Sequence, residues 1–294
     1  MHDYLLSLLL GIVEGLTEFL PVSSTAHLRI SEELLGISLS DGYWKMYSIV
    51  IQLGAILCLP IYFGPRILQF VRSFPRGERG DRTVLTHPLS LVIVAFVCTA
   101  VPSYLLTKVI GKNLESLTVM GWSLLVGGIV MWIVDALFGT PRSGGRHQTE
   151  RMDDMSLGEA VWIGICQIAS AVFPGTSRSM STIAGGQLVG MSRPAALEFS
   201  FFLSFPTMLA ATAYTLLKTL RPKGPEAASA LGVMPANGHQ WMVLMIGFIV
   251  SFLVALAVVA WFMNWVRQRG FTPFAVYRIV LGIAVLAWVL KGHS

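Results

Sequence analysis

The sequence predicts an all-α integral membrane protein made of two inverted-topology repeats, each with one re-entrant helix hairpin and three transmembrane helices. Three observations predict this fold. Of the 294 residues, 54% are hydrophobic and only 13% are charged, whereas a soluble domain carries about 25% charged residues. The mean hydropathy is +0.67, and the apolar residues form long runs. Finally, one polar motif occurs twice, once in each half.

Six apolar segments are long enough to cross the hydrocarbon layer, which takes roughly 20 residues per helix. Three of them follow one another in each half of the chain. We expect transmembrane helices at about 44–64, 88–109 and 117–138 in the first half, and at about 194–217, 239–264 and 272–291 in the second.

The two halves align with each other. Residues 11–24 pair with residues 164–177 at an offset of 153 (164 − 11), and Pro21 and Pro174 keep this spacing. Two pairings further along have offsets of 152 and 154. A nearly constant offset indicates an internal duplication. The repeats are then residues 1–150 and 151–294, within one integrated membrane domain.

Each half begins with an apolar segment that a proline and several polar residues interrupt, at 3–36 and at 157–190. Neither side of the interruption is long enough to cross the membrane. Such re-entrant hairpins are tolerated only inside protein or beside a water-filled cavity. Three crossings per half is an odd number, so the halves would be inverted and the two hairpins would meet near the membrane midplane.

Lysine and arginine are unevenly distributed between the two sides of this topology, with eleven on the side of the connectors 65–87 and 139–156 and seven on the other. The positive-inside rule places these connectors in the cytoplasm and both termini outside. The net charge of +5 is explained in this way, and we expect no nucleic-acid partner. Cys58, Cys98 and Cys166 lie in apolar segments, where they are expected as small buried side chains.

The first hairpin carries two carboxylates, Glu14 and Glu18, one helical turn apart on one face. Carboxylates in a membrane segment face a polar cavity or each other. They could bind a divalent cation, act as a general base, or simply lie at the membrane interface.

Directly after these glutamates comes Pro21-Val-Ser-Ser-Thr-Ala-His27. The proline ends the first helix, and the hydroxyl residues are typical of the N-cap of a second one. The start of a helix is an anion site. Ser24 is a candidate nucleophile, Ser23 and Thr25 are candidate phosphate ligands, and His27 could carry a proton.

The second hairpin repeats the pattern as Pro174-Gly-Thr-Ser-Arg178-Ser-Met-Ser-Thr182. Arg178 stands out because arginine suits phosphate recognition and stays charged in an apolar site; the alternative is an arginine that reaches out to the interface. One half thus supplies acids, a hydroxyl and a histidine, and the other a cation. This combination is typical of phosphoryl transfer. The hydroxyl residues that accompany Arg178 as candidate phosphate ligands are Thr176, Ser177, Ser179 and Thr182.

Both motifs resemble the signatures of the bacitracin-resistance family of undecaprenyl-diphosphate phosphatases, and the resemblance covers nearly the whole chain. It implies hydrolysis of undecaprenyl diphosphate to the monophosphate at the outer face of the bacterial inner membrane, carrier-lipid recycling for cell-wall synthesis, and bacitracin resistance. It also implies a divalent metal, Mg²⁺ or Ca²⁺, which Glu14 and Glu18 would hold. Two departures from the family pattern, at Ala26 and at Met180-Ser181, affect packing at the two turns.

Two questions stay open at the level of sequence. Ser24 or a water molecule could be the nucleophile, with His27 or Glu18 taking the proton and Arg178 stabilising the developing charge. The chain could instead be a polyprenyl-phosphate transporter or flippase, since inverted repeats with broken helices are also the architecture of secondary transporters. The lipid diphosphate and the membrane are the expected partners, and a homodimer is left open.

Overall fold

The computed structural model describes residues 2–38, 41–106, 116–140, 149–220 and 233–291, with only the backbone at 219–220. This part of the chain is helical, and its only β-structure is one isolated bridge between Thr149 and Met191. The prediction of an all-α membrane protein is confirmed. Some residues used in the sequence argument lie outside the described segments: the end of the span 88–109, and Lys108, Lys112, Arg142, Arg146, Arg221 and Lys223.

Within the described segments, six helical stretches are long and apolar enough to cross a membrane. The first is interrupted at Leu57, since Pro60 has no N–H to donate to the carbonyl of residue 56. The segments are α3–α4 (Gly42–Ile56 and Cys58–Tyr62), α6 (Pro88–Leu105), α8 (Leu117–Phe138), α11 (Arg193–Leu220), α13 (Gly238–Arg269) and α14 (Thr272–Leu290).

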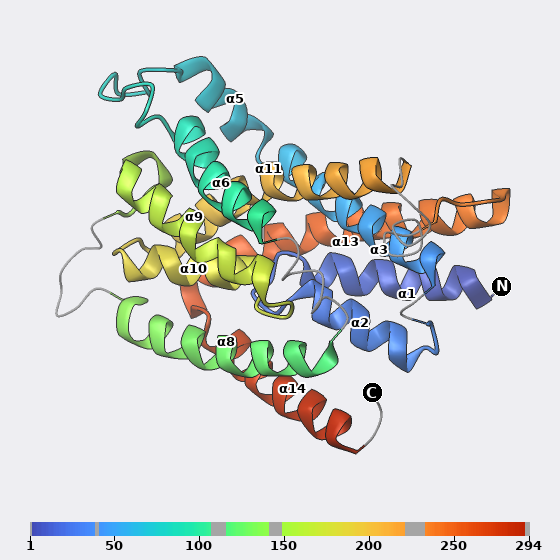
Figure 1. Cartoon of the computed structure of the whole chain (residues 1–294). Coiled ribbons are helices and arrows are strands. Elements are labelled where there is room, and N and C mark those ends of the chain that lie inside the picture. The colour runs from blue at the N-terminus through green and yellow to red at the C-terminus, as the bar shows by residue number, and fades with distance from the viewer. Residues whose placement is uncertain (1, 39–40, 107–115, 141–148, 221–232, 292–294) are drawn as a thin grey trace.

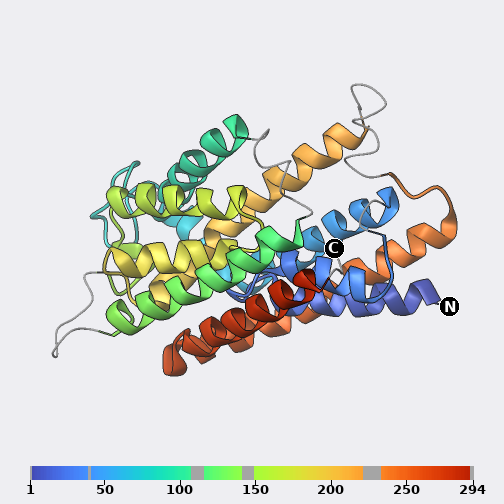
Figure 2. The ribbon, with the colours of Figure 1, turned by 60° about the horizontal axis from the view of Figure 1, so that its bottom comes forward.

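Two helix pairs are shorter: α1 (His2–Thr17) with α2 (Ser24–Leu34), and α9 (Leu157–Val172) with α10 (Arg178–Leu188). A helix of 16 residues rises about 24 Å, which is less than the roughly 30 Å of the hydrocarbon core. Helix α1 ends at Thr17, whose carbonyl would need the N–H that Pro21 lacks. In both views, α1 and α9 start at opposite ends of the molecule and run toward its middle, where the two turns lie (Figures 1 and 2).

The helices pack in pairs, with α8 along α14, α1 along α13 and α6 along α9. Glycines allow close approach in these pairs. A Cβ atom added at Gly11 of α1 would lie 2.9 Å from the carbonyl oxygen of Gly247 in α13, and one added at Gly164 of α9 would lie 2.5 Å from that of Ala95 in α6. Both contacts leave no room for a side chain.

The connectors at the opposite end from the N-terminus form short elements, α5 (Gly64–Ser73) and the 3₁₀ helix η2 (Met152–Asp154). Arg66 of α5 pairs with both Asp153 and Glu198, the latter at 3.0 Å. These ion pairs join the two connectors and α11. The outward faces of the long helices are apolar and exposed, as lipid contact requires; examples are Trp122, Ile133, Ile249, Leu253 and Val280.

Candidate active site

The turns between α1 and α2 and between α9 and α10 have the same local structure. Ser23 and Ser177 are the two non-glycine residues with positive φ in the described chain, at 74° and 71°. Each hydroxyl accepts a hydrogen bond of 3.4 Å from the N–H three residues further on, at Ala26 and Met180. Both serines are N-caps, as the hydroxyl clusters predict. Strained backbone of this kind concentrates at functional sites.

This geometry changes the pairing of the two motifs. The sequence alignment pairs Ser24 with Ser177, whereas in the structure Ser23 is the counterpart of Ser177. The reason is Gly175, whose φ of 93° accommodates one additional residue between the proline and the cap of the second turn. The offset at the caps is therefore 154 (177 − 23), and the first residues of α2 and α10 are Ser24 and Arg178.

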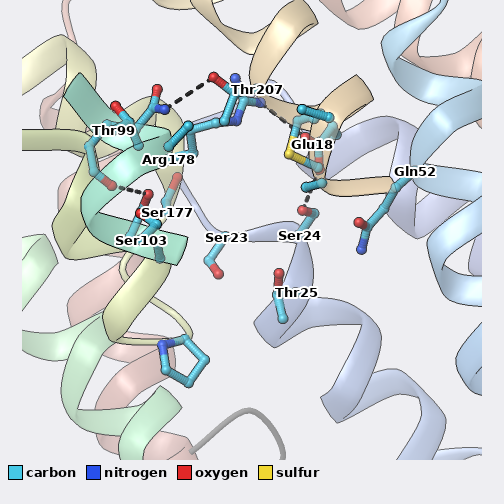
Figure 3. A pocket seen from close by; sticks show the side chains of 18 of the residues that line it. Glu18, Ser23, Ser24, Thr25, Gln52, Thr99, Ser103, Ser177, Arg178 and Thr207 are labelled. Atoms are coloured by element: carbon cyan, nitrogen blue, oxygen red, sulfur yellow. Dashed lines mark hydrogen bonds and ion pairs between the residues drawn. The ribbon is translucent and has the colours of Figure 1, made fainter. Parts of the chain in front are cut away.

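Both turns border a cavity of about 520 Å³ that α3, α6, α9 and α11 complete (Figure 3). Its polar lining gathers at the turns, and its lining from α6 and α11 includes large apolar and aromatic side chains. The polar group comprises Glu18, Ser23, Ser24, Thr25, Gln52, Thr99, Ser103, Gln167, Ser170, Ser177, Arg178 and Thr207, and the apolar group includes Phe96, Ala100, Tyr104, Met208, Ala211 and Tyr214.

Glu18 joins the two turns. Its Oε2 accepts a hydrogen bond of 2.5 Å from Ser24 Oγ, and its Oε1 accepts one of 3.0 Å from Arg178 Nη2. The carboxylate is thus bonded at once to the first residue of α2 and to the first residue of α10 (Figure 3). All three side chains are at most one-tenth exposed, so water screens these interactions little.

The same point of the molecule is rich in hydrogen-bond donors. Helices α2 and α10 both begin at the cavity, and the first N–H groups of a helix have no intrahelical acceptor. Together with the helix dipoles they favour an anion. In addition, Nη1 of Arg178 is buried and has no hydrogen-bond partner within the described segments. The site can therefore bind a phosphoryl group through backbone and guanidinium donors.

The implied divalent metal would need oxygen ligands, and Glu14 supplies two. Its carboxylate is fully buried next to that of Glu18, and neither oxygen has a hydrogen-bond partner among the residues that the structure places. An unsatisfied carboxylate beside a second one fits a hard cation such as Mg²⁺ or Ca²⁺. Glu14 does not line the cavity itself, and no group of three or more His, Cys, Asp or Glu side chains gathers in the described ranges.

The structure separates the remaining predicted site residues into two groups. Ser23, Thr25 and Ser177 line the cavity with Glu18, Ser24 and Arg178, whereas His27, Thr176, Ser179 and Thr182 do not. His27 Nδ1 lies 2.7 Å from the carbonyl oxygen of Ser23, and its Nε2 lies 2.7 Å from the Tyr277 hydroxyl. Thr182 lies 2.7 Å from Ser200 Oγ, between α10 and α11.

Several polar residues of the cavity were not predicted as site residues, among them Gln52, Gln167 and Thr207. Gln167 donates a hydrogen bond of 3.2 Å to Thr207, and Gln52 lines the cavity from α3. The repeat itself contained a signal for Gln167, because the alignment pairs it with Glu14. Thr207 and Gln52 are single polar residues in apolar spans, and their direction depends on packing.

The chain is similar to known proteins over nearly its whole length. Residues 7–284 match the family described as bacitracin resistance protein BacA. An undecaprenyl-diphosphatase of Koribacter versatilis is 68% identical over 291 residues, covering 99% of this chain and 100% of the relative. Undecaprenyl-diphosphatases of Rhizobium etli and Caldanaerobacter subterraneus are each 39% identical, over 99% and 95% of this chain and 98% and 93% of their own lengths. The chain belongs to the bacitracin resistance protein BacA family.

Proposed function

We propose that this membrane protein hydrolyses undecaprenyl diphosphate to undecaprenyl phosphate, which recycles the carrier lipid for cell-wall synthesis and confers resistance to bacitracin. The observation that carries the proposal is the Glu18 carboxylate bonded at once to Ser24 and Arg178 in one cavity. The names of the relatives supply the substrate. The cavity suits an amphiphile, with the diphosphate at the two turns and the start of the prenyl chain between α6 and α11.

Ser24 is the nucleophile in this proposal. Its Oγ attacks the terminal phosphorus while the proton passes to Glu18 Oε2, 2.5 Å away. The bond from that phosphorus to the bridging oxygen breaks, and undecaprenyl phosphate leaves. Water then hydrolyses the phosphoserine and releases inorganic phosphate. Arg178 and the N–H groups at the starts of α2 and α10 stabilise the charge on the phosphoryl oxygens.

A divalent metal, when bound, would neutralise phosphate charge in this reaction. Glu14 and Glu18 are the residues that would hold it. We expect chelation to abolish phosphate release and Glu14→Gln to raise the Mg²⁺ or Ca²⁺ concentration needed for half-maximal activity. Unchanged activity after exhaustive chelation would exclude this part of the proposal.

We also propose that the two halves are inverted repeats whose hairpins are re-entrant. Two reciprocal contacts support this. The Gly11–Gly247 contact maps onto Gly164–Ala95 when the halves are exchanged. In the same way, an added Cβ at Gly128 would lie 2.9 Å from the Ala275 carbonyl oxygen and one at Gly282 would lie 2.9 Å from that of Gly121. Reciprocal contacts are typical of two halves related by a two-fold axis.

The membrane in which the protein lies and its orientation there are proposed from the charge distribution and the family. We propose the bacterial inner membrane, with the arginine-rich connectors in the cytoplasm and the chemistry at the outer, periplasmic face.

A homodimer is tested by measuring the mass of the detergent-solubilised protein with multi-angle light scattering.

The central experiment measures phosphate release from undecaprenyl diphosphate by purified protein in detergent with Mg²⁺. Ser24→Ala and Arg178→Ala should each lower turnover by about 10²-fold or more. Ser204→Ala is the matched control, because it removes a buried hydroxyl that donates to the Ser200 carbonyl of its own helix. Near-wild-type turnover in both site variants would exclude the proposed mechanism. A phosphoserine trapped at Ser24 distinguishes attack by Ser24 from attack by water.

A lipid transporter is the second candidate, favoured by the hairpins that enter from opposite ends (Figure 1). A transporter needs to bind phosphate but not to cleave it. Phosphate release in detergent, where no membrane separates two compartments, supports the phosphatase. Lipid transfer across reconstituted bilayers without phosphate release would favour the transporter.

A further inference from the structure

One side chain joins both turns of the site. Arg278 of α14 is fully buried, and its guanidinium donates three hydrogen bonds to backbone carbonyls. Nη1 donates to Pro21 at 3.0 Å, and Nη2 donates to Gly175 and to Ser123, each at 3.1 Å. Arg278 therefore connects the α1–α2 turn, the α9–α10 turn and α8.

The two turn carbonyls are equivalent positions of the repeat. Pro21 and Gly175 each lie two residues before their cap serine, so the offset is again 154 (175 − 21). At the same offset, the counterpart of Arg278 in the first half is Leu124, which is buried and apolar. The Arg278 guanidinium thus binds the equivalent carbonyl of each turn, and the first half has no arginine at the corresponding position.

Gly127 of α8 leaves the space that the Arg278 guanidinium occupies. A Cβ atom added at Gly127 of α8 would contact Nη2 and would lie 3.3 Å from Cζ of Arg278. All hydrogen bonds that the structure assigns to Arg278 go to carbonyls, and Nε has no partner within the described ranges. A buried charge in a membrane protein is costly and marks a functional role.

We propose that Arg278 is a positioning residue for the reaction: it fixes the two turns relative to each other so that Ser24 and Arg178 meet on Glu18. Ser24 lies three residues after Pro21, and Arg178 lies three residues after Gly175. Each reacting group is therefore the same short distance along the chain from an anchored carbonyl. This inference rests on the proposed phosphatase function.

The test separates turnover from substrate binding. Arg278→Lys keeps the charge but loses the planar fork that reaches two turns. We expect kcat to fall on the order of a hundredfold, because misplacement by about 1 Å has that effect, while KM changes severalfold at most. Arg193→Lys is the matched control, since Arg193 bonds Asp135 at the far end of α8. It should lower the melting temperature and leave kcat unchanged below melting.

A second pair of variants covers the case in which Arg278→Lys does not fold. Gly127→Ala pushes on the guanidinium and on the end of the Met180 side chain, and it should also lower kcat. Gly121→Ala on the same helix meets the Leu286 and Val285 side chains of α14 instead and should not lower kcat. Full kcat in folded Arg278→Lys or Gly127→Ala would overturn the inference while the phosphatase assignment stands. An absence of phosphate release from the wild-type protein would instead contradict the proposed function itself.

Discussion

At the scale of single residues, distances distinguish between candidates that the sequence left equal. Both Glu18 and His27 could accept the proton of Ser24. In the structure, the Ser24 hydroxyl donates a hydrogen bond to the Glu18 carboxylate. The two ring nitrogens of His27 have other partners: Nδ1 faces the Ser23 carbonyl and Nε2 faces the Tyr277 hydroxyl. Residue spacing alone could not show where His27 points, because its partner Tyr277 belongs to α14, about 250 residues further along the chain.

The first prediction compares these two residues. Glu18→Gln keeps the shape of the side chain but removes the proton acceptor and the charge that Arg178 binds. We expect kcat to fall by about 10²- to 10⁴-fold, and His27→Gln to have a smaller effect. Steady-state phosphate release measures both. A larger loss in His27→Gln than in Glu18→Gln would return the role of base to His27.

The second prediction concerns Thr182, which the sequence grouped with the phosphate ligands. Its hydroxyl lies between α10 and α11, in contact with Ser200. Thr182→Val should therefore lower the free energy of unfolding by about 1 kcal/mol with little change in kcat or KM. Thermal unfolding in detergent and phosphate release test this. A large rise in KM at unchanged stability would show that Thr182 contacts the substrate.

At the scale of elements, the caps of α2 and α10 combine a hydrogen bond with a strained backbone. Glycine adopts positive φ without strain, while alanine retains the strain and loses the cap. We predict that Ser23→Gly lowers stability by a few tenths of a kcal/mol and Ser23→Ala by about 1 kcal/mol or more. Ser156, which caps α9 at a φ of −94°, is the control. At Ser156 the backbone is unstrained, so glycine has no conformational advantage over alanine there. If the stability difference between the Gly and Ala variants were equal at Ser23 and Ser156, strain at Ser23 would be excluded.

The connectors contribute a pH-dependent part of the stability. Burial by itself raises the pKa of Asp153, but hydrogen bonds from Arg66 and from Arg151, the latter at 3.1 Å, outweigh burial and lower the pKa below its usual value. The ionised form therefore stabilises the fold above the unfolded pKa of about 3.9, and this contribution is lost as pH falls through the lower folded value.

The corresponding variant is Asp153→Asn. We expect it to lower stability at neutral pH by about 1 kcal/mol and to weaken the loss of stability below pH 4. Melting temperatures from pH 3 to 7 in detergent check this, with Asp81→Asn as the control, because Asp81 is more exposed and its contact with Arg82 is 3.9 Å. Equal pH profiles of Asp153→Asn and the wild type would exclude the contribution.

At the scale of the whole molecule, the proposed orientation places the N-terminal end of α1 and the arginine-rich connectors on opposite sides of the membrane. Single cysteines introduced at His2 and Arg76, in a background with the native cysteines replaced by serine, test this. In intact cells, a membrane-impermeant maleimide should label position 2 and not position 76. Labelling of position 76 and not of position 2 would show the opposite orientation, with the active site open to the cytoplasmic face.

The sequence by itself determined the membrane class, and it predicted the duplication and the residue types of the site, because hydrophobic length, a constant offset and motif chemistry can be read along the chain. It did not determine that Ser23 rather than Ser24 matches Ser177, that His27, Thr176, Ser179 and Thr182 lie away from the cavity, or that Gln52, Gln167 and Thr207 line it. Nor could it show that Arg278 holds both turns. These relations depend on where separate helices bring their side chains, and only tertiary packing decides that.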